Sequence, residues 1–233
     1  MIPQDYITAW SRVAPWANQR QVEQDLIISR ALVAIFSDPF LRGELRFRGG
    51  TALNKLHFPA PLRYSEDIDL VRTSAGPIGP VLDGVRAVLE PWLGKAKSDP
   101  SPVAPKLRFR VDAEGESADV RISLKVEINT REREAYDPPI EIPFGVENPW
   151  FTGEAAIRTF SREEMLATKL RALLQRNKGR DLFDLPLLST DRAKALTDET
   201  LKATFVRVMK ELIDRIPGDE WAKAGEMRER FGV

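Results

Sequence analysis

The sequence predicts an α+β protein, in which helices flank a mixed β-sheet and the C-terminal part is helical. Residues 106–112 and 118–130 alternate apolar and polar side chains, as the strands of a half-buried hairpin do. Residues 21–38 instead space their apolar side chains as an amphipathic helix does. The sheet is therefore expected between about residues 45 and 160, after this helix.

The composition is that of a globular protein. The chain has 233 residues, of which 42% are hydrophobic and 30% charged, enough for one large domain or two small ones. It contains no cysteine, which excludes disulfides and thiolate chemistry. Its 35 basic residues balance 35 acidic ones, so a nucleic acid would have to meet a local basic patch. The chain has neither a membrane-spanning apolar run nor a secretory pattern, so we expect a cytoplasmic protein.

A glycine pair follows the first predicted strand. Residues 45–47 form that strand, and Gly49 and Gly50 come directly after it. Residues 51–58 predict a short helix with Thr51 at or near its start. The pair therefore marks the turn from strand to helix.

The centre of the chain predicts a helix and then a hairpin. Residues 81–93 are expected to be helical, and residues 98–105 are too rich in proline to be anything but a loop. The two alternating segments then pair across a turn at residues 113–117. Further strands extend to about residue 160, completing the sheet.

The C-terminal part begins with a capping box. Ser161 and Glu164 have the spacing in which each side chain satisfies the backbone of the other at a helix start. The sequence from Ser161 to near the C-terminus is expected to be helical. We therefore predict two domains, residues 1–160 and residues 161–233.

An Asp-x-Asp pair lies on the second predicted strand. Because alternate residues share a face, Asp67 and Asp69 point one way while Ile68 and Leu70 enter the core. Neighbouring carboxylates raise the pKa of one another unless a cation screens them. Mg²⁺ prefers oxygen ligands and would meet that need. The alternative is the exposed polar face of a half-buried strand.

The glycine pair could form the phosphate-binding part of such a metal site. Gly49 and Gly50 have no side chains, so a phosphate could approach the backbone N–H groups at the start of the next helix. Thr51 could cap that helix or donate a hydrogen bond to a phosphate oxygen. Together with the Asp-x-Asp pair, this pattern indicates a metal-bound triphosphate. The glycines alone would indicate only a tight turn.

A third carboxylate comes from the second strand of the hairpin. Leu124, Val126 and Ile128 take one face of this strand, so Lys125 and Glu127 take the other. Glu127 could join Asp67 and Asp69 around one or two metal ions. The alternative is a Lys/Glu pattern on a solvated strand face.

Four blocks of the sequence, "RGGTALNKL", "RYSEDIDL", "LKVEIN" and "EEMLATKLRALLQRNKGRDLFDL", resemble the AbiEii/AbiGii-type nucleotidyltransferase toxins. These toxins belong to the DNA polymerase β-like nucleotidyltransferase superfamily, and the likeness spans about residues 47–185. It implies a nucleotidyltransferase-like fold and a toxin of a type IV-like bacterial toxin–antitoxin pair. Such a toxin would use Mg²⁺ to transfer NMP from NTP to RNA, with tRNA 3′ ends the acceptor for some members, and so block translation. It would also have a separately encoded antitoxin, often a winged-helix protein.

The resemblance also assigns active-site roles in the fourth block. The family's lysine and aspartates carry onto Lys169, Asp181 and Asp184, of which we favour Asp184 over Asp181 for a direct role. Lys169 falls within the apolar arc of its predicted helix, and it would meet the triphosphate or else extend past the edge of the core. One aspartate would orient Lys169, although Asp181 could instead be an ordinary acidic residue at a helix start.

The predicted reaction is an in-line transfer of a nucleotide to an RNA hydroxyl. The residues assigned to the nucleotide are Gly49, Gly50, Thr51, Ser65 and Lys169. The residues assigned to RNA or phosphate are Arg48, Arg63, Arg176 and Arg180. The alternatives are an enzyme that modifies a protein or small molecule, and a nucleotide- or RNA-binding module without activity. The acid-free basic stretch over residues 165–180 favours RNA.

Overall fold

The computed structural model describes residues 2–58, 64–114 and 121–176, and for residues 170–176 it describes the backbone alone. The chain divides into two compact units, which are described separately. The first comprises Met1–Glu134 and Pro139–Phe160, and the second comprises Ala135–Pro138 and Ser161–Val233. The first unit contains the whole sheet, and the second unit contains helix α6.

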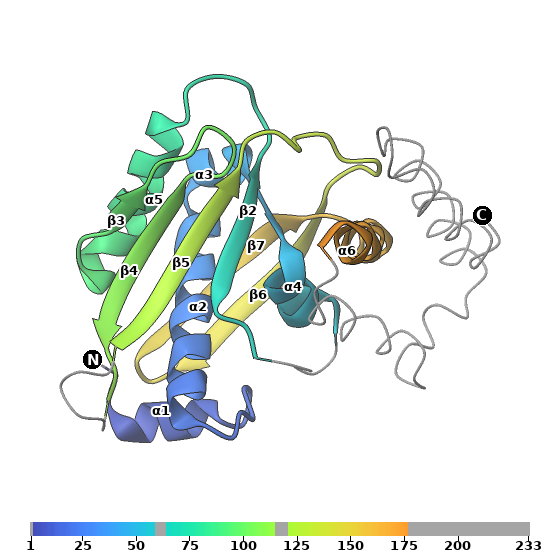
Figure 1. The fold of residues 1–233 in the computed structure, drawn as a ribbon. Coiled ribbons are helices and arrows are strands. Elements are labelled where there is room, and N and C mark those ends of the chain that lie inside the picture. Colours follow the sequence, from blue (N-terminus) through green and yellow to red (C-terminus); the bar gives the residue numbers. More distant parts are fainter. Residues whose placement is uncertain (1, 59–63, 115–120, 177–233) are drawn as a thin grey trace, which may run out of the picture. The chain divides into compact units, whose positions relative to one another are not determined.

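The first unit is built on a seven-stranded sheet with the order β3-β4-β5-β2-β1-β7-β6 (Figure 1). Its strands are β1 (Leu45–Arg48), β2 (Asp67–Arg72), β3 (Lys97–Asp99), β4 (Lys106–Asp112), β5 (Arg121–Asn129), β6 (Ile140–Asn148) and β7 (Phe151–Thr159). The pairs β2–β5 and β1–β7 are parallel, and the other neighbouring pairs are antiparallel. The predicted α+β class with a mixed sheet is therefore confirmed.

Helices cover one face of this sheet. Helix α2 (Gln19–Ser37) lies against β5, β6 and β7, and α5 (Gly79–Leu93) packs on β4 and on α2 (Figure 1). Asn18 caps α2 by accepting a hydrogen bond from the backbone of Arg20. The helix starts two residues before the predicted position because this cap lies ahead of the apolar pattern. The shorter helices α1 (Gln4–Trp10) and α3 (Pro39–Glu44) pack against α2.

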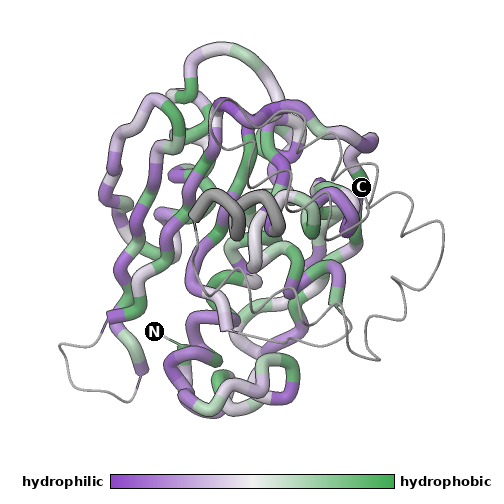
Figure 2. Tube along the Cα trace, turned by 45° about the vertical axis from the view of Figure 1, so that its right-hand side comes forward, coloured by the Kyte–Doolittle hydropathy of each residue, from purple (hydrophilic) through white to green (hydrophobic). Residues whose placement is uncertain are grey.

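Burial alternates along β4 and β5 as the sequence predicts, and Figure 2 shows hydrophilic and hydrophobic residues following one another along the chain. On β5, the side chains of Ile122, Leu124, Val126 and Ile128 are fully buried beneath the helices. Removing such side chains from water is the main stabilising contribution to the sheet. Their polar neighbours on β5 must therefore lie on the opposite face of the sheet, which carries Lys125 and Glu127 and is called the functional face below.

Two local predictions need correction. Residues 98–105 were expected to form only a loop, but Lys97–Asp99 form the edge strand β3, which pairs with β4 through its backbone. Backbone pairing does not require apolar side chains, so the hydrophobic pattern gives no sign of it. The helix expected over residues 51–58 begins earlier, as α4 (Gly49–Ala52), and continues as a π-helical turn, η1 (Leu53–His57). The glycines thus lie within the helix rather than before it.

A buried ion pair joins η1 to α2. Lys55 Nζ lies 3.0 Å from Asp25 Oδ1 and donates a hydrogen bond to Ser29 Oγ at 2.9 Å. Trp10 Nε1 donates to the same Asp25 oxygen at 3.0 Å, which brings α1 into the cluster. The two charged side chains are only 11% and 8% exposed. Such a pair is costly to break, because one charge is then buried without its partner.

Replacing Lys55 by Met is expected to lower the free energy of unfolding by about 3–5 kcal/mol. The reason is that the buried carboxylate of Asp25 would lose its charged partner and retain only neutral donors. Urea denaturation measures the change. The control is Arg86→Met, since Arg86 is partly exposed and pairs with the exposed Asp83, a pair that should contribute less than about 1 kcal/mol. Equal effects of the two substitutions would contradict this account of the cluster.

In the second unit, α6 (Arg162–Arg176) begins where the sequence predicts. Ser161 Oγ accepts a hydrogen bond from the backbone N–H of Glu164 at 3.2 Å, which is one half of the capping box. The carboxylate of Glu164 is directed elsewhere and accepts from the backbone N–H groups of Tyr136 and Asp137. It thereby ties the short segment Ala135–Pro138 to the helix. The helices predicted beyond residue 176 lie outside the described residues.

Candidate active site

Three carboxylates meet on the face of the sheet opposite α2. In the parallel pair β2–β5, Asp67 lies beside Lys125 and Asp69 lies beside Glu127. Because Ile68 and Leu70 are buried on the face of the sheet that the helices cover, Asp67 and Asp69 point to the opposite face. The structure therefore brings together Asp67, Asp69 and Glu127, from segments about sixty residues apart in the chain.

Gly49 lies directly against the Asp-x-Asp pair. Strand β1 pairs with β2 so that Arg48 is opposite Asp69, and Gly49 follows at once. The backbone of Gly49 has φ of +82°, which L side chains rarely adopt. A Cβ atom at this position would lie 2.5 Å from Asp69 Oδ2, far inside van der Waals contact. Glycine is thus required both by the backbone conformation and by the close approach of the Asp69 carboxylate.

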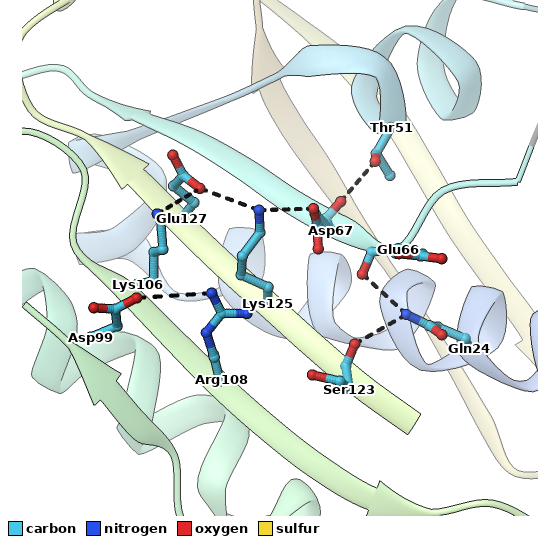
Figure 3. A network of polar contacts seen from close by, with 10 residues as sticks. All are labelled: Gln24, Thr51, Glu66, Asp67, Asp99, Lys106, Arg108, Ser123, Lys125 and Glu127. Carbon is cyan, nitrogen blue, oxygen red and sulfur yellow. Dashed lines mark hydrogen bonds and ion pairs between the residues drawn. The ribbon is translucent and has the colours of Figure 1, made fainter. Parts of the chain in front are cut away.

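Thr51 has a different local role from the predicted cap. The residue at the N-cap of α4 is Arg48, and no side chain caps this helix. Thr51 is buried, and its hydroxyl donates to the backbone carbonyl of Asp67 at 2.7 Å (Figure 3). This bond fixes α4 to the start of β2. Gly50 and Ser65 are also buried beside this junction, and the nucleotide-binding role of all these residues stays a prediction.

Lys125 lies between two of the acids (Figure 3). Its Nζ atom is 2.8 Å from Asp67 Oδ2 and 3.3 Å from Glu127 Oε2. A second ammonium, Lys106 Nζ, lies 3.7 Å from the same Glu127 oxygen. Sequence reasoning placed Lys125 on the face of Glu127 but gave it no role of its own. The signal that was lacking is the β2–β5 register, which sets Lys125 beside Asp67.

Burial and neighbouring charges shift the pKa values of Asp69 and Lys125. Burial raises the pKa of Asp69, and the charges of Asp67 and Glu127 raise it further, against the opposing effect of Lys125 and Arg48. Burial alone would lower the pKa of Lys125, but the hydrogen bond to Asp67 and the three carboxylates raise it instead. Lys125 therefore stays an ammonium ion, and a further cation near Asp69 would be favoured.

The carboxylate oxygens of the cluster are suitable ligands for a metal ion such as Mg²⁺, although Lys125 pairs with two of these carboxylates in the structure. Carboxylate oxygens are the ligands that Mg²⁺ prefers. Within residues 2–58, 64–114 and 121–176, however, no three histidine or acidic side chains are placed to hold a metal ion together. The Lys125 ammonium lies at the oxygens of Asp67 and Glu127 instead. An ion bound by all three acids would have to replace Lys125 as their partner.

Gln24 holds β5 and the segment just before β2 to α2. Its amide nitrogen donates to the carbonyl of Glu66 at 3.1 Å and to that of Ser123 at 3.2 Å, just before β2 and within β5 (Figure 3). Tyr64 donates through its hydroxyl to Gln24 Oε1. A polar cavity of about 260 Å³ lies beside these bonds. The bonds fix the parallel register on which the meeting of the three carboxylates depends.

The remaining predicted residues are placed less completely. Arg48 Nη1 lies 2.6 Å from Glu132 Oε2 in a partly exposed ion pair. Lys169 lies on α6 in the second unit and is partly exposed. Of Arg176 the structure describes only the backbone. Outside the described residues lie Arg63, Arg180, Asp181 and Asp184. Their assigned roles stay predictions.

None of the helices in the part of the chain that the structure describes is long and apolar enough to cross a membrane.

Comparison with known proteins gives both a family and a fold. A family model described as "Nucleotidyl transferase AbiEii toxin, Type IV TA system" matches residues 30–230. The fold is similar to that of MenT4, a nucleotidyltransferase toxin from Mycobacterium tuberculosis H37Rv, with 17% identity, a TM-score of 0.55 and coverage of 96% of this chain and 95% of that one. It is also similar to JHP933 from Helicobacter pylori, with 20% identity, a TM-score of 0.52 and coverage of 92% of both chains. No curated protein sequence matches the chain significantly.

Proposed function

Because the chain belongs to the AbiEii family of nucleotidyltransferase toxins from type IV toxin–antitoxin systems, we propose that it transfers NMP from an NTP to the 3′ end of an RNA. We expect tRNA to be the acceptor and translation to be blocked as a result. The family itself implies a cognate antitoxin as partner. The observation that carries the proposal is the cluster of Asp67, Asp69 and Glu127 on the functional face of the sheet.

The three carboxylates would hold Mg²⁺, with Asp69 as the most constrained ligand. When bound, the ion supplies positive charge for the α-phosphate and for the attacking and leaving oxygens. Asp69 is fixed from one side by the backbone of Gly49 and pairs in register with Glu127. Lys125, which lies between Asp67 and Glu127, would contact a phosphate oxygen. The chain's own contribution is therefore to position acids and one lysine around the reacting phosphate.

The reaction would be an in-line displacement at the α-phosphorus. The 3′-oxygen of the RNA forms the new P–O bond, the bond to pyrophosphate breaks, and the proton of the 3′-hydroxyl passes to a base or to water. The backbone N–H groups at Gly49 and Gly50 would contact the outer phosphates. The family resemblance further implies that Lys169 would meet the triphosphate and that Asp184 or Asp181 would orient it.

A labelling experiment tests this proposal. The protein is incubated with each α-labelled NTP, Mg²⁺ and total cellular RNA, and the products are separated on a denaturing gel. We expect label on RNA of tRNA size with at least one NTP, and no label when EDTA removes the divalent ions. Label on protein alone would indicate a protein acceptor and contradict the proposal. The absence of any label, from a protein that still binds RNA or NTP, would favour a binding module.

A further inference from the structure

A row of basic side chains lies beside the carboxylates on the functional face. On β4, Lys106, Arg108 and Arg110 alternate with Leu107 and Phe109, which are fully buried beneath the helices. The three cations therefore point to the same side of the sheet as Asp67 and Asp69. We call these three residues the basic row.

The register connects the basic row to the active site. Lys106 is opposite Glu127, Arg108 is opposite Lys125, and Arg110 is opposite Ser123 on the neighbouring strand. Lys125 in turn contacts Asp67. Figure 3 shows Lys106 and Arg108 on the same side as Lys125 and Glu127. The row thus lies on β4, which is directly adjacent to β5, the strand that carries Lys125 and Glu127.

The ion pairs of the basic row are weak and can be exchanged for phosphate. Arg108 Nη2 lies 3.8 Å from Asp99 Oδ2 with both side chains about half exposed, and Lys106 pairs with Glu127 at 3.7 Å. The Arg108–Asp99 pair, as an exposed pair, contributes only about 0–1 kcal/mol, and the Lys106–Glu127 pair is long. Arg110 is exposed, and no acidic group among the described residues forms an ion pair with it. The positive charges of the row therefore contribute little to ion pairs within the protein and are available to a phosphate.

The spacing of the row suits the backbone of a single strand of nucleic acid. Residues two apart on a strand are about 6.6 Å apart, which is similar to the separation of successive phosphates in an extended chain. Guanidinium groups bind phosphate through paired N–H donors. Helices α2 and α5 both lie on the opposite face of the sheet. Within the first unit, the row is therefore a partly exposed strip of charge that leads to the carboxylates.

We propose that the basic row is the docking surface for the phosphate backbone of the acceptor RNA and directs its 3′ end toward Asp67 and Asp69. The inference rests on the proposed function, because it assumes that the acceptor is RNA. Contacts with phosphate fix position and register without reading sequence. The row would therefore raise affinity for RNA in general and leave the choice of RNA to other parts of the protein.

The test is RNA binding in the absence of NTP. The anisotropy of fluorescently labelled tRNA is measured for the full chain and for an Arg108→Gln/Arg110→Gln double variant, over a range of salt concentrations. We expect at least a tenfold loss of affinity at low salt. The slope of log K against log salt should also fall, by about 0.7 for each single-strand phosphate contact removed. The control double variant, Arg86→Gln/Lys95→Gln, removes the same charge on and just after α5 and should bind as wild type does.

Two further readouts keep the docking surface and the proposed function separable. If wild type labels RNA, the basic-row variant should show a raised KM for RNA and an unchanged KM for NTP. If the variant instead had the same KM for RNA and the same KM for NTP as wild type, the docking surface would be overturned and the proposed function would stand. If wild type binds RNA through the row but transfers no nucleotide to it, the docking surface stands and the proposed function fails. Arg110→Glu, a single change at an exposed position, should weaken binding more than Arg110→Gln. Equal tRNA affinity of the folded variants and wild type would refute the inference.

Discussion

Replacing Asp69 by Asn is expected to lower the rate of nucleotidyl transfer by about 10²–10³-fold or more, the usual cost of removing one essential electrostatic group. Asn keeps the shape of the side chain beside Gly49 but removes the negative charge that a metal ion requires. The measurement is the rate of pyrophosphate release at saturating NTP and RNA. Asp112→Asn is the control, because Asp112 is an exposed acid at the far end of β4, paired with Arg121. It should keep wild-type activity.

The same substitution should leave the metal-free protein at least as stable as wild type at neutral pH. Burial and the neighbouring carboxylates raise the pKa of Asp69 in the folded state. The neutral form therefore favours folding, and this contribution is lost as the pH rises through the folded-state pKa. Asn mimics the neutral form at every pH. The gain in the thermal midpoint should be seen at pH 7 in EDTA and should vanish in acid, below the pKa of an unfolded aspartate.

Replacing Gly49 by Ala is expected to reduce activity by about 10²-fold, since catalysis is sensitive to displacements of about 1 Å. The new Cβ would lie 2.5 Å from Asp69 Oδ2, so either the carboxylate or the β1–α4 backbone must shift. The positive φ of Gly49 adds strain of about 1–2 kcal/mol. Steady-state kinetics and thermal unfolding measure the two effects separately.

Gly94 provides a matched control for this substitution. It also has a positive φ, of +78°, but a Cβ atom there would meet nothing within 4 Å. Gly94→Ala should therefore lose a similar amount of stability and keep full activity. If both variants retained activity, the contact between Gly49 and Asp69 would have no part in catalysis. If both lost it, the loss would follow from strain rather than from the active site.

The sequence was sufficient to predict the features of the site that depend on local pattern. Strand alternation placed Asp67 and Asp69 on one face, and the same reasoning placed Glu127 on the polar face of its own strand. The family resemblance, inferred from four blocks, is confirmed by the match over residues 30–230. These features need only the neighbouring residues along the chain, because side-chain direction has a period of two in a strand.

Features that depend on contacts between distant segments were not predictable in this way. The role of Lys125 follows from the β2–β5 register, which no local pattern encodes. From the sequence, Gly49 was interpreted as a position where a phosphate could approach the backbone. The structure shows in addition that the carboxylate of Asp69 lies close to Gly49. The Lys55–Asp25 pair joins two helical segments that no local pattern in the sequence brings together. In each case tertiary packing, rather than propensity, determines the arrangement.

The central claim is that the carboxylates of β2 and β5 form the active site of an RNA nucleotidyltransferase. Its most direct test is an assay that measures the transfer of α-labelled NMP to RNA. Wild type, Asp69→Asn and Asp112→Asn are compared in parallel with Mg²⁺. We predict labelled RNA from wild type and from Asp112→Asn, and none above background from folded Asp69→Asn. Equal labelling of RNA by all three proteins would contradict the account.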